Sequence, residues 1–144
     1  MLGCQSESWS HADLADFLPA LFEIVRSRRP DAWVYAEVQW DNLLDREAEE
    51  RILPLARDRK IGVLVYLPFG RTRLFRRVGE RPLPDWAAEF DASTWAQFFL
   101  KFILGHPAVT CIIPATDKAA HMTDNMRANF GRVPDAAQRE EMLR

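Results

Sequence analysis

The stretch IGVLVYLPFG, residues 61–70, decides the fold class of this chain. Its first six residues form a short, continuous apolar run, which is typical of a β-strand covered on both faces in a parallel sheet. VTCII at residues 109–113 has the same character, and AWVYAEV at residues 32–38 also predicts a strand. Residues 2–4 offer one more strand at the very start, so the sequence predicts four parallel strands at most.

One predicted helix precedes the strand at residues 32–38, and a second separates that strand from the one at residues 61–66. In residues 10–28 apolar side chains recur at i, i+3, i+4 and i+7, which predicts a helix that Pro19 kinks or restarts. Asp45 is expected to cap a second helix over residues 46–58, although Pro54 again intrudes on the pattern. Each of these helices lies between two predicted strands or ahead of one.

The second half of the chain continues the alternation. Ser93 is expected to cap a strong helix that Gly105 stops, after a loop rich in arginine and proline. One face of this helix is apolar and holds Trp95, Phe98, Phe99, Phe102 and Ile103. Asp117 is expected to cap a helix that runs to about residue 129, and residues 134–143 predict a last amphipathic helix.

Strands that alternate with helices, joined by connections long enough to hold a helix, predict an α/β fold with a parallel sheet and right-handed crossovers. Two nucleotide-binding folds fit this order less well, because GxGxxG and GxxxxGK[ST] do not occur in the sequence. At 144 residues, with 48% hydrophobic and 28% charged residues, the chain predicts a single folded domain.

Charge and cysteine content restrict the function classes. The net charge of -2 gives no basic field for a nucleic acid or an anionic membrane, so neither is expected as a partner. No apolar run approaches a membrane span and the amino terminus lacks a signal pattern, so a cytoplasmic protein is expected. Cys4 and Cys111 are expected to be reduced core thiols, and the three scattered histidines indicate no metal site.

Three strings in this order resemble the aldo/keto reductases. YLPFG at residues 66–70 is similar to the Y-S-P-L-G string after the seventh strand of that family. WAQFFLKFILGHPAVTCIIPATDKAAHMTDN at residues 95–125 is similar to its last helix, last strand and cofactor loop. EVQWDNLLDREAEERILPLARDRKIGVLVY at residues 37–66 resembles its sixth strand and the helix that follows.

The resemblance covers the carboxy-terminal half of that family and implies an incomplete, half TIM-type (β/α) barrel with about four parallel strands over residues 1–144. In the family the catalytic Asp, Tyr, Lys and His lie in the other half, and the only tyrosines here, Tyr35 and Tyr66, align to other roles. No catalytic residue is therefore assigned. The expected function is the cofactor-binding half of an NAD(P)H-dependent carbonyl reductase, inactive alone. The alternative is a non-catalytic remnant, or a domain for assembly or nucleotide binding.

The resemblance also implies residues for the nicotinamide end of a dinucleotide. Tyr66 would lay its ring against the nicotinamide, and Gln39 would bind the carboxamide. Pro68 and Gly70 complete the motif, and Arg71 after it can reach the pyrophosphate. Without the resemblance, a core tyrosine and a solvated glutamine are the simpler interpretations of the first two residues.

At the adenosine end the resemblance implies two groups. Pro114, Ala115 and Thr116 match a segment that places a hydroxyl and helix amides near an adenosine phosphate. Asp124 and Asn125 match the acidic residue and the asparagine that meet the adenine. A capped surface helix explains the same periodicity without a ligand.

The choice between NADP and NAD depends on charge near the adenosine. His121 stands where many family members have an arginine for the extra phosphate of NADP, and Lys118 can substitute for that charge. The resemblance therefore implies NADP, with NAD as an alternative.

Half a barrel leaves strand edges and interior side chains uncovered. Such a chain can pair with a second copy, complement a separate barrel half, or persist as an open sheet. The sequence leaves these three outcomes open.

Overall fold

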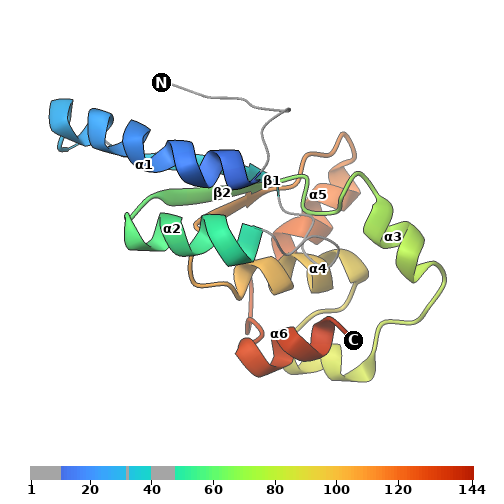
Figure 1. Ribbon diagram of the computed structural model, residues 1–144. Helices are drawn as coiled ribbons and strands as arrows, with labels where there is room; N and C mark the ends of the chain where they lie inside the picture. The colour runs from blue at the N-terminus through green and yellow to red at the C-terminus, as the bar shows by residue number, and fades with distance from the viewer. Residues whose placement is uncertain (1–10, 32, 40–47) are drawn as a thin grey trace.

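The computed structural model describes residues 11–31, 33–39 and 48–144 and contains a parallel sheet in the order β1-β2-β3 (Figure 1). The strands are β1 (Tyr35–Gln39), β2 (Gly62–Tyr66) and β3 (Cys111–Ile113). All three predicted strands are confirmed, each shorter at its amino end than the sequence pattern indicates. The fourth strand expected at residues 2–4 lies outside the described residues.

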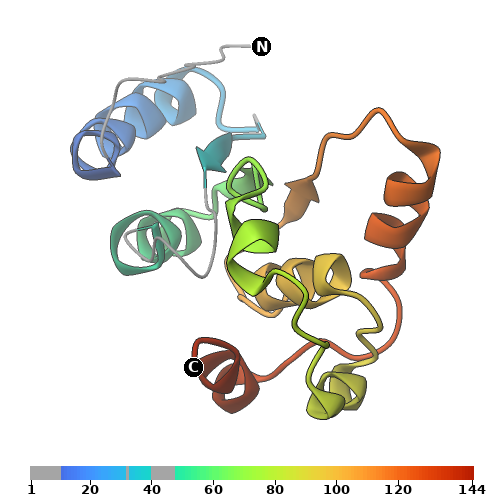
Figure 2. The ribbon, with the colours of Figure 1, turned by 90° about the vertical axis from the view of Figure 1, so that its right-hand side faces the viewer.

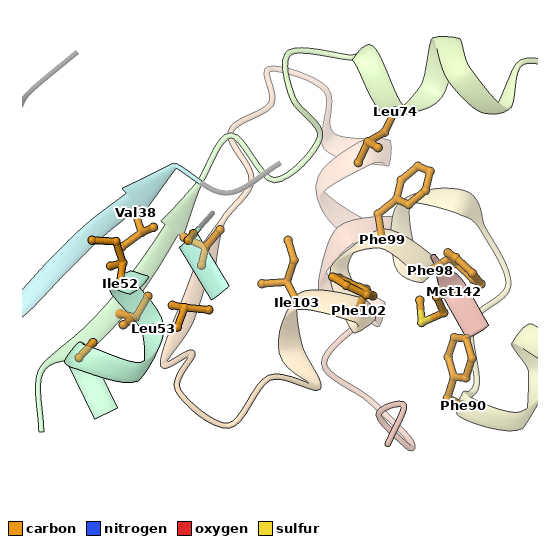
Figure 3. Close-up of a cluster of buried hydrophobic side chains, with 14 of the residues drawn as sticks. Val38, Ile52, Leu53, Leu74, Phe90, Phe98, Phe99, Phe102, Ile103 and Met142 are labelled. Atoms are coloured by element: carbon orange, nitrogen blue, oxygen red, sulfur yellow. The ribbon is translucent and has the colours of Figure 1, made fainter. Parts of the chain in front are cut away.

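One face of the sheet packs against helices. Val38 pairs in register with Val65, which pairs with Ile112, so these side chains share a face. The core contains three valines of this face, Val38, Val63 and Val65. They belong to one buried cluster with residues of α2 (Leu53–Asp58) and α4 (Trp95–Leu104) (Figure 3). Branched side chains suit this position because they fit the pleated surface.

The first helices accommodate their prolines differently. The expectation was that Pro19 kinks or restarts its helix, and α1 (His11–Arg28) continues through Pro19, so the restart does not occur. Pro54 lies in the first turn of α2 (Leu53–Asp58), where a missing N–H costs little. A π-helical segment, η1 (Ala48–Ile52), directly precedes α2.

The stretch expected to be an arginine- and proline-rich loop contains two short helices. They are α3 (Arg73–Val78) and the 3-10 helix η2 (Asp85–Phe90). The loop prediction is wrong there because a few apolar side chains among the arginines pack on the core. The Phe75 ring lies 5.6 Å from that of Phe99, and the Trp86 ring lies 5.6 Å from that of Phe98.

α4 (Trp95–Leu104) is the central helix of the core. Its N-cap is Thr94 rather than Ser93, since the Thr94 hydroxyl accepts the backbone N–H of Gln97 at 3.2 Å. Ser93 donates its own N–H and hydroxyl to the Gln97 side-chain oxygen instead. Gly105 is the C-cap, as expected.

α4 is buried all round, beyond the apolar face that its sequence pattern predicts. A continuous run of its residues is buried: Gln97, Phe98, Phe99, Leu100, Lys101, Phe102 and Ile103. Figure 3 shows four of these side chains between those of the sheet and α2 on one side and Phe90 and Met142 on the other. The helix is therefore covered by the sheet, α2, η2 and the carboxy-terminal segment together.

Lys101 is fully buried, and burial lowers its pKa. Its ammonium donates hydrogen bonds of 2.7 Å to the backbone carbonyls of Phe130 and Arg132. The Asp91 carboxylate accepts the backbone N–H of Arg132 at 2.8 Å, which closes the same turn from the other side. Gly131 lies between Phe130 and Arg132 and has a φ of +74°. A Cβ at this position would lie 2.5 Å from a carboxylate oxygen of Asp91, so the turn requires glycine.

The last helices are α5 (Ala119–Arg127) and α6 (Ala136–Met142). Asp117 does not cap α5. The N-cap position is Lys118, whose backbone N–H is accepted by the Thr116 hydroxyl at 3.2 Å. α6 begins with a complete capping box of Asp135 and Gln138.

Cys111 is a free, exposed thiol on the uncovered face of the sheet, so the expectation of a core thiol is wrong for this residue. Cys4 lies outside the described residues, as does Asp45, the expected cap of the second helix. Within the described residues, none of the helices combines the length and apolar character that a membrane span requires.

His106, just after α4, makes the stability of the fold depend on pH. Burial and the Arg139 charge lower its pKa below the usual 6.5, and its Nδ1 accepts the Ala108 N–H at 3.2 Å. Between the lowered value and 6.5 the unfolded chain binds more protons than the folded chain, so stability falls as the pH falls through that window.

Denaturation with urea at pH 7.5 and at pH 5.5 should therefore show a loss of stability on acidification that becomes smaller in His106→Gln. His121→Gln, on the exposed surface of α5, is the matched control and should keep the full loss. An unchanged pH dependence in His106→Gln would contradict this assignment.

Candidate functional site

Three strands end side by side at one edge of the sheet. Gln39 pairs in register with Tyr66, and Tyr66 pairs with Ile113. Because neighbouring strands lie about 4.8 Å apart, these three residues span about 10 Å along the carboxyl edge. The loops that follow β2 and β3 therefore leave the sheet from the same edge, which is where parallel α/β proteins bind ligands.

Gln39 and Tyr66 belong to the face of the sheet that the helices do not cover. The alternation along β2 places Tyr66 on the same face as Leu64, opposite to the buried Val63 and Val65. Figure 2 shows α2 and α4 together on the other face, with α1 and α5 at the two ends of the sheet. Gln39 is exposed and Tyr66 is half-buried, so both side chains are accessible from this open face.

The loop after β2 has an unusual backbone. Leu67, Gly70, Arg71 and Thr72 all have positive φ, between 51° and 72°. Pro68 and Gly70 are buried, and the Gly70 N–H donates to the Leu67 carbonyl at 2.9 Å, which makes a tight turn. Left-handed non-glycine residues cost free energy and cluster at functional sites, so this turn is a candidate ligand loop.

The loop after β3 leads into α5. Pro114 and Thr116 are half-buried, whereas Ala115 and Lys118 are exposed. The Thr116 hydroxyl lies beside the first turn of α5, because it accepts the Lys118 N–H. Unpaired backbone N–H groups at a helix start attract anions, and the helix dipole adds to that effect.

The predicted basic residues are distributed over two elements. Arg71 belongs to the turn after β2, while Lys118 and His121 lie at the start of α5, three residues apart. All three side chains are exposed. Asp124 and Asn125 lie farther along α5, about 9 Å from its start at 1.5 Å per residue.

Asp124 links α5 to α4. Its two carboxylate oxygens accept hydrogen bonds from the Thr94 hydroxyl at 2.8 Å and the Gln97 amide at 2.6 Å. The resemblance in the sequence implies that this residue meets the adenine, and the link to α4 was not predicted. The sequence gives only a weak sign of this link, which is that Thr94 lies at the start of a predicted helix and can cap it.

Asn125 is the next residue of α5 and is 6% exposed. Among the residues that the structure describes, no hydrogen bond satisfies its side-chain amide. A buried polar group left without a partner costs about 1–3 kcal/mol, and native proteins rarely retain one without a bound ligand or water. Asn125 is therefore a candidate ligand-binding residue on this helix.

Metal chemistry finds no support in the described part of the chain. No group of three His, Cys, Asp or Glu side chains there is arranged to hold an ion.

Comparisons with known proteins show which proteins have a similar fold. Neither a protein-family model nor a curated protein matches the sequence. Several solved structures match the fold, and two of them are aldo-keto reductases. The thermostable aldo-keto reductase Tm1743, solved with the inhibitor epalrestat, has a TM-score of 0.61 at 22% identity, over 84% of this chain and 43% of that one. Aldo-keto reductase AKR11C1 from Bacillus halodurans, in its holo form, has a TM-score of 0.57 at 18% identity.

The second match covers 94% of this chain and 57% of the reductase chain, so the chain spans about half the length of the structures it matches. The resemblance in the sequence depended on three strings, at residues 37–66, 66–70 and 95–125, and the match in fold is independent of them. The chain therefore shares the fold of the aldo-keto reductases over the portion of that fold that it spans.

Proposed function

We propose that this chain is the cofactor-binding, carboxy-terminal half of an aldo/keto reductase-type oxidoreductase, and that residues 1–144 act as one domain. The observation that carries the proposal is that Gln39 and Tyr66 are paired in register at the carboxyl edge of the sheet. They are the two residues that the resemblance assigns to the nicotinamide. Residues 27 positions apart thus become neighbours at an accessible edge.

At the nicotinamide end, Tyr66 provides a flat ring and Gln39 an amide. The ring stacks on one face of the nicotinamide, so that the other face remains open. The Gln39 amide both donates and accepts, which matches the carboxamide group. Both side chains start from strands, which hold them more rigidly than loops do.

At the phosphate end, Thr116 and the amides at the start of α5 bind the negative charge, helped by Lys118. Arg71 adds a guanidinium from the neighbouring loop, while Pro68, Gly70, Pro114 and Ala115 shape the two loops. Lys118 and His121 together favour NADP over NAD, because the extra phosphate of NADP needs a nearby cation.

At the adenine end, Asn125 is the binding residue and Asp124 its neighbour. The unsatisfied amide of Asn125 fits a base that donates and accepts hydrogen bonds. Asp124 holds α5 in place through Thr94 and Gln97, and so positions Asn125.

When bound, a reduced nicotinamide supplies a hydride for the reduction of an aldehyde or ketone. The chain positions that group but contributes no proton donor, since Tyr66 serves as the stacking ring and Tyr35 lies at the opposite end of its strand. Carbonyl-dependent oxidation of NADPH by the isolated chain should therefore equal the buffer rate.

Titration of NADPH fluorescence tests the binding claim. Tyr66→Ala should weaken the affinity about tenfold, because it removes a stacking ring worth about 1.5 kcal/mol. Tyr66→Phe keeps the ring and should stay within about twofold of the parent, which a hydrogen-bonding role for the hydroxyl would not allow.

Tyr35→Ala is the matched control. Tyr35 shares the open face with Tyr66 but lies at the amino end of β1, so its removal should leave the affinity unchanged. No NADPH binding at millimolar concentration, or equal losses in Tyr66→Ala and Tyr35→Ala, would overturn the proposed function. In that case a role in assembly becomes the better explanation, because one face of the sheet is not covered by helices.

A further inference from the structure

The short helix α3 carries apolar and basic side chains on opposite faces. Its apolar face packs on the core, because Leu74 is 1% exposed and the Phe75 ring lies 5.6 Å from that of Phe99. Residues at i, i+3 and i+4 share one face of a helix. The face of α3 opposite to the core, called here the arginine face, consists of Arg73, Arg76 and Arg77. The packing of the apolar face therefore fixes the direction in which the arginine face points.

The arginine face lies at the outside of the molecule, in the connection that leads away from the sheet (Figure 1). Arg76 and Arg77 are exposed, and none of the described residues binds either guanidinium through a hydrogen bond or an ion pair. The side chain of Arg81, just after the helix, is exposed and unpaired in the same sense. By contrast, six arginines elsewhere in the described chain each pair with a carboxylate.

The segment 71–81 contains a single acidic residue, Glu80, which does not neutralise these arginines. If α3 continued, Glu80 would lie one turn after Arg76 and could pair with it. The helix ends instead at Gly79, whose φ of +56° turns the chain away. Within the described residues Glu80 forms no ion pair. The backbone thus leaves the positive charge of the segment without a counter-charge from its own turn.

The charge of this segment is opposite to that of the rest of the chain. Residues 71–81 contain five arginines and one glutamate, whereas the whole chain has 19 basic and 21 acidic residues. The remainder therefore has 14 basic and 20 acidic residues. Like charges four residues apart, such as Arg73 and Arg77, destabilise a helix slightly, so the stability of α3 does not explain this concentration of charge. An anionic partner would offset the repulsion.

We propose that the arginine face binds a short acidic segment of a partner protein, that is, a run of Asp or Glu side chains. The six residues of α3 extend about 9 Å, and an extended chain advances about 3.3 Å per residue. The helix therefore matches about three residues of such a segment, and Arg81 lengthens the contact by one cation. Guanidinium groups bind carboxylates through paired, charge-assisted hydrogen bonds, which give the contact direction as well as charge.

The surroundings of the arginine face favour a short acidic segment over a nucleic acid or an anionic membrane. Among the described residues, none of the exposed large hydrophobic side chains lies between residues 67 and 94. The face therefore offers no exposed ring for stacking on bases and no apolar group for insertion into a bilayer. A long nucleic acid or a membrane would also extend beyond the segment and meet the net negative remainder of the chain.

The fluorescence anisotropy of a labelled hexaglutamate peptide, titrated with the full chain, tests this proposal. The parent protein should bind the peptide at about 20 mM salt and more weakly at about 150 mM, because salt screens exposed charges. The double variant Arg76→Gln with Arg77→Gln should weaken the affinity about tenfold, and Arg81→Gln alone about twofold. The three side chains are exposed, so circular dichroism of these variants should match the parent.

The double variant Arg28→Gln with Arg29→Gln is the matched control. It removes the same charge from two adjacent exposed arginines where α1 ends, and α1 and α3 lie on opposite sides of the fold in Figure 1. The control should keep the affinity for the peptide within about twofold of the parent. No binding of the peptide at low salt would overturn the proposal, as would equal losses in the two double variants. Tighter binding of a DNA oligonucleotide or of phosphatidylserine vesicles than of the peptide would overturn it too.

Discussion

Replacing Arg139 by methionine should destabilise the fold by about 3–5 kcal/mol, because it removes the guanidinium that pairs with the buried Glu49 carboxylate. The two side chains are only 13% and 8% exposed and form an ion pair that joins α6 to η1. Arg139 also donates to the Phe102 carbonyl at 2.9 Å, and its guanidinium lies 4.4 Å from the centre of the Phe102 ring. A single side chain thus connects the last helix, α4 and the segment before α2.

Equilibrium denaturation with urea measures this loss. The double variant Glu49→Gln with Arg139→Met should recover part of it, since the buried charge is gone. Arg59→Met removes the exposed pair with Glu23, at 3.0 Å, and should change the stability by less than about 1 kcal/mol. A loss in Arg139→Met no larger than in Arg59→Met would contradict the buried role of the pair.

Phe99→Ala should cost about 3–5 kcal/mol, because it opens a cavity at the centre of the core. Phe99 is completely buried, and its ring lies 5.5 Å from Trp95 and 5.6 Å from Phe75. The loss should appear as a lower midpoint of urea denaturation with little change in slope.

Phe99→Leu is the control for this second change. It keeps an apolar side chain of similar reach and should lose markedly less than Phe99→Ala. If both variants lost the same amount, the ring contacts rather than the filled volume would determine the stability of this part of the core.

The strands and the central helix could be predicted from the sequence because their burial leaves a pattern. IGVLVY has no polar residue, and α4 repeats aromatic residues at helical spacing. α3 could not be predicted in this way, because Leu74 and Phe75 stand among arginines and only their contact with α4 makes the segment helical. The exposure of Cys111 could not be predicted, since a short strand does not reveal in the sequence which of its faces is covered.

The candidate site was predictable in part for a similar reason. Gln39 and Tyr66 end strands, so their place at the carboxyl edge follows from the parallel order once the sheet is inferred. The hydrogen bonds from Thr94 and Gln97 to Asp124 join residues about 30 positions apart across two helices. No local pattern encodes such a contact, since it depends on how the helices pack.

The buried ammonium of Lys101 has a consequence for how the protein comes apart. It fastens the 130–132 turn from within α4, just as Asp124 fastens α5 from the other side. Because both contacts hold their segments to α4, we expect residues 85–132 to unfold as one cooperative block. A ligand that binds α5 would then protect the whole of that block from transient unfolding, including residues that the ligand does not contact.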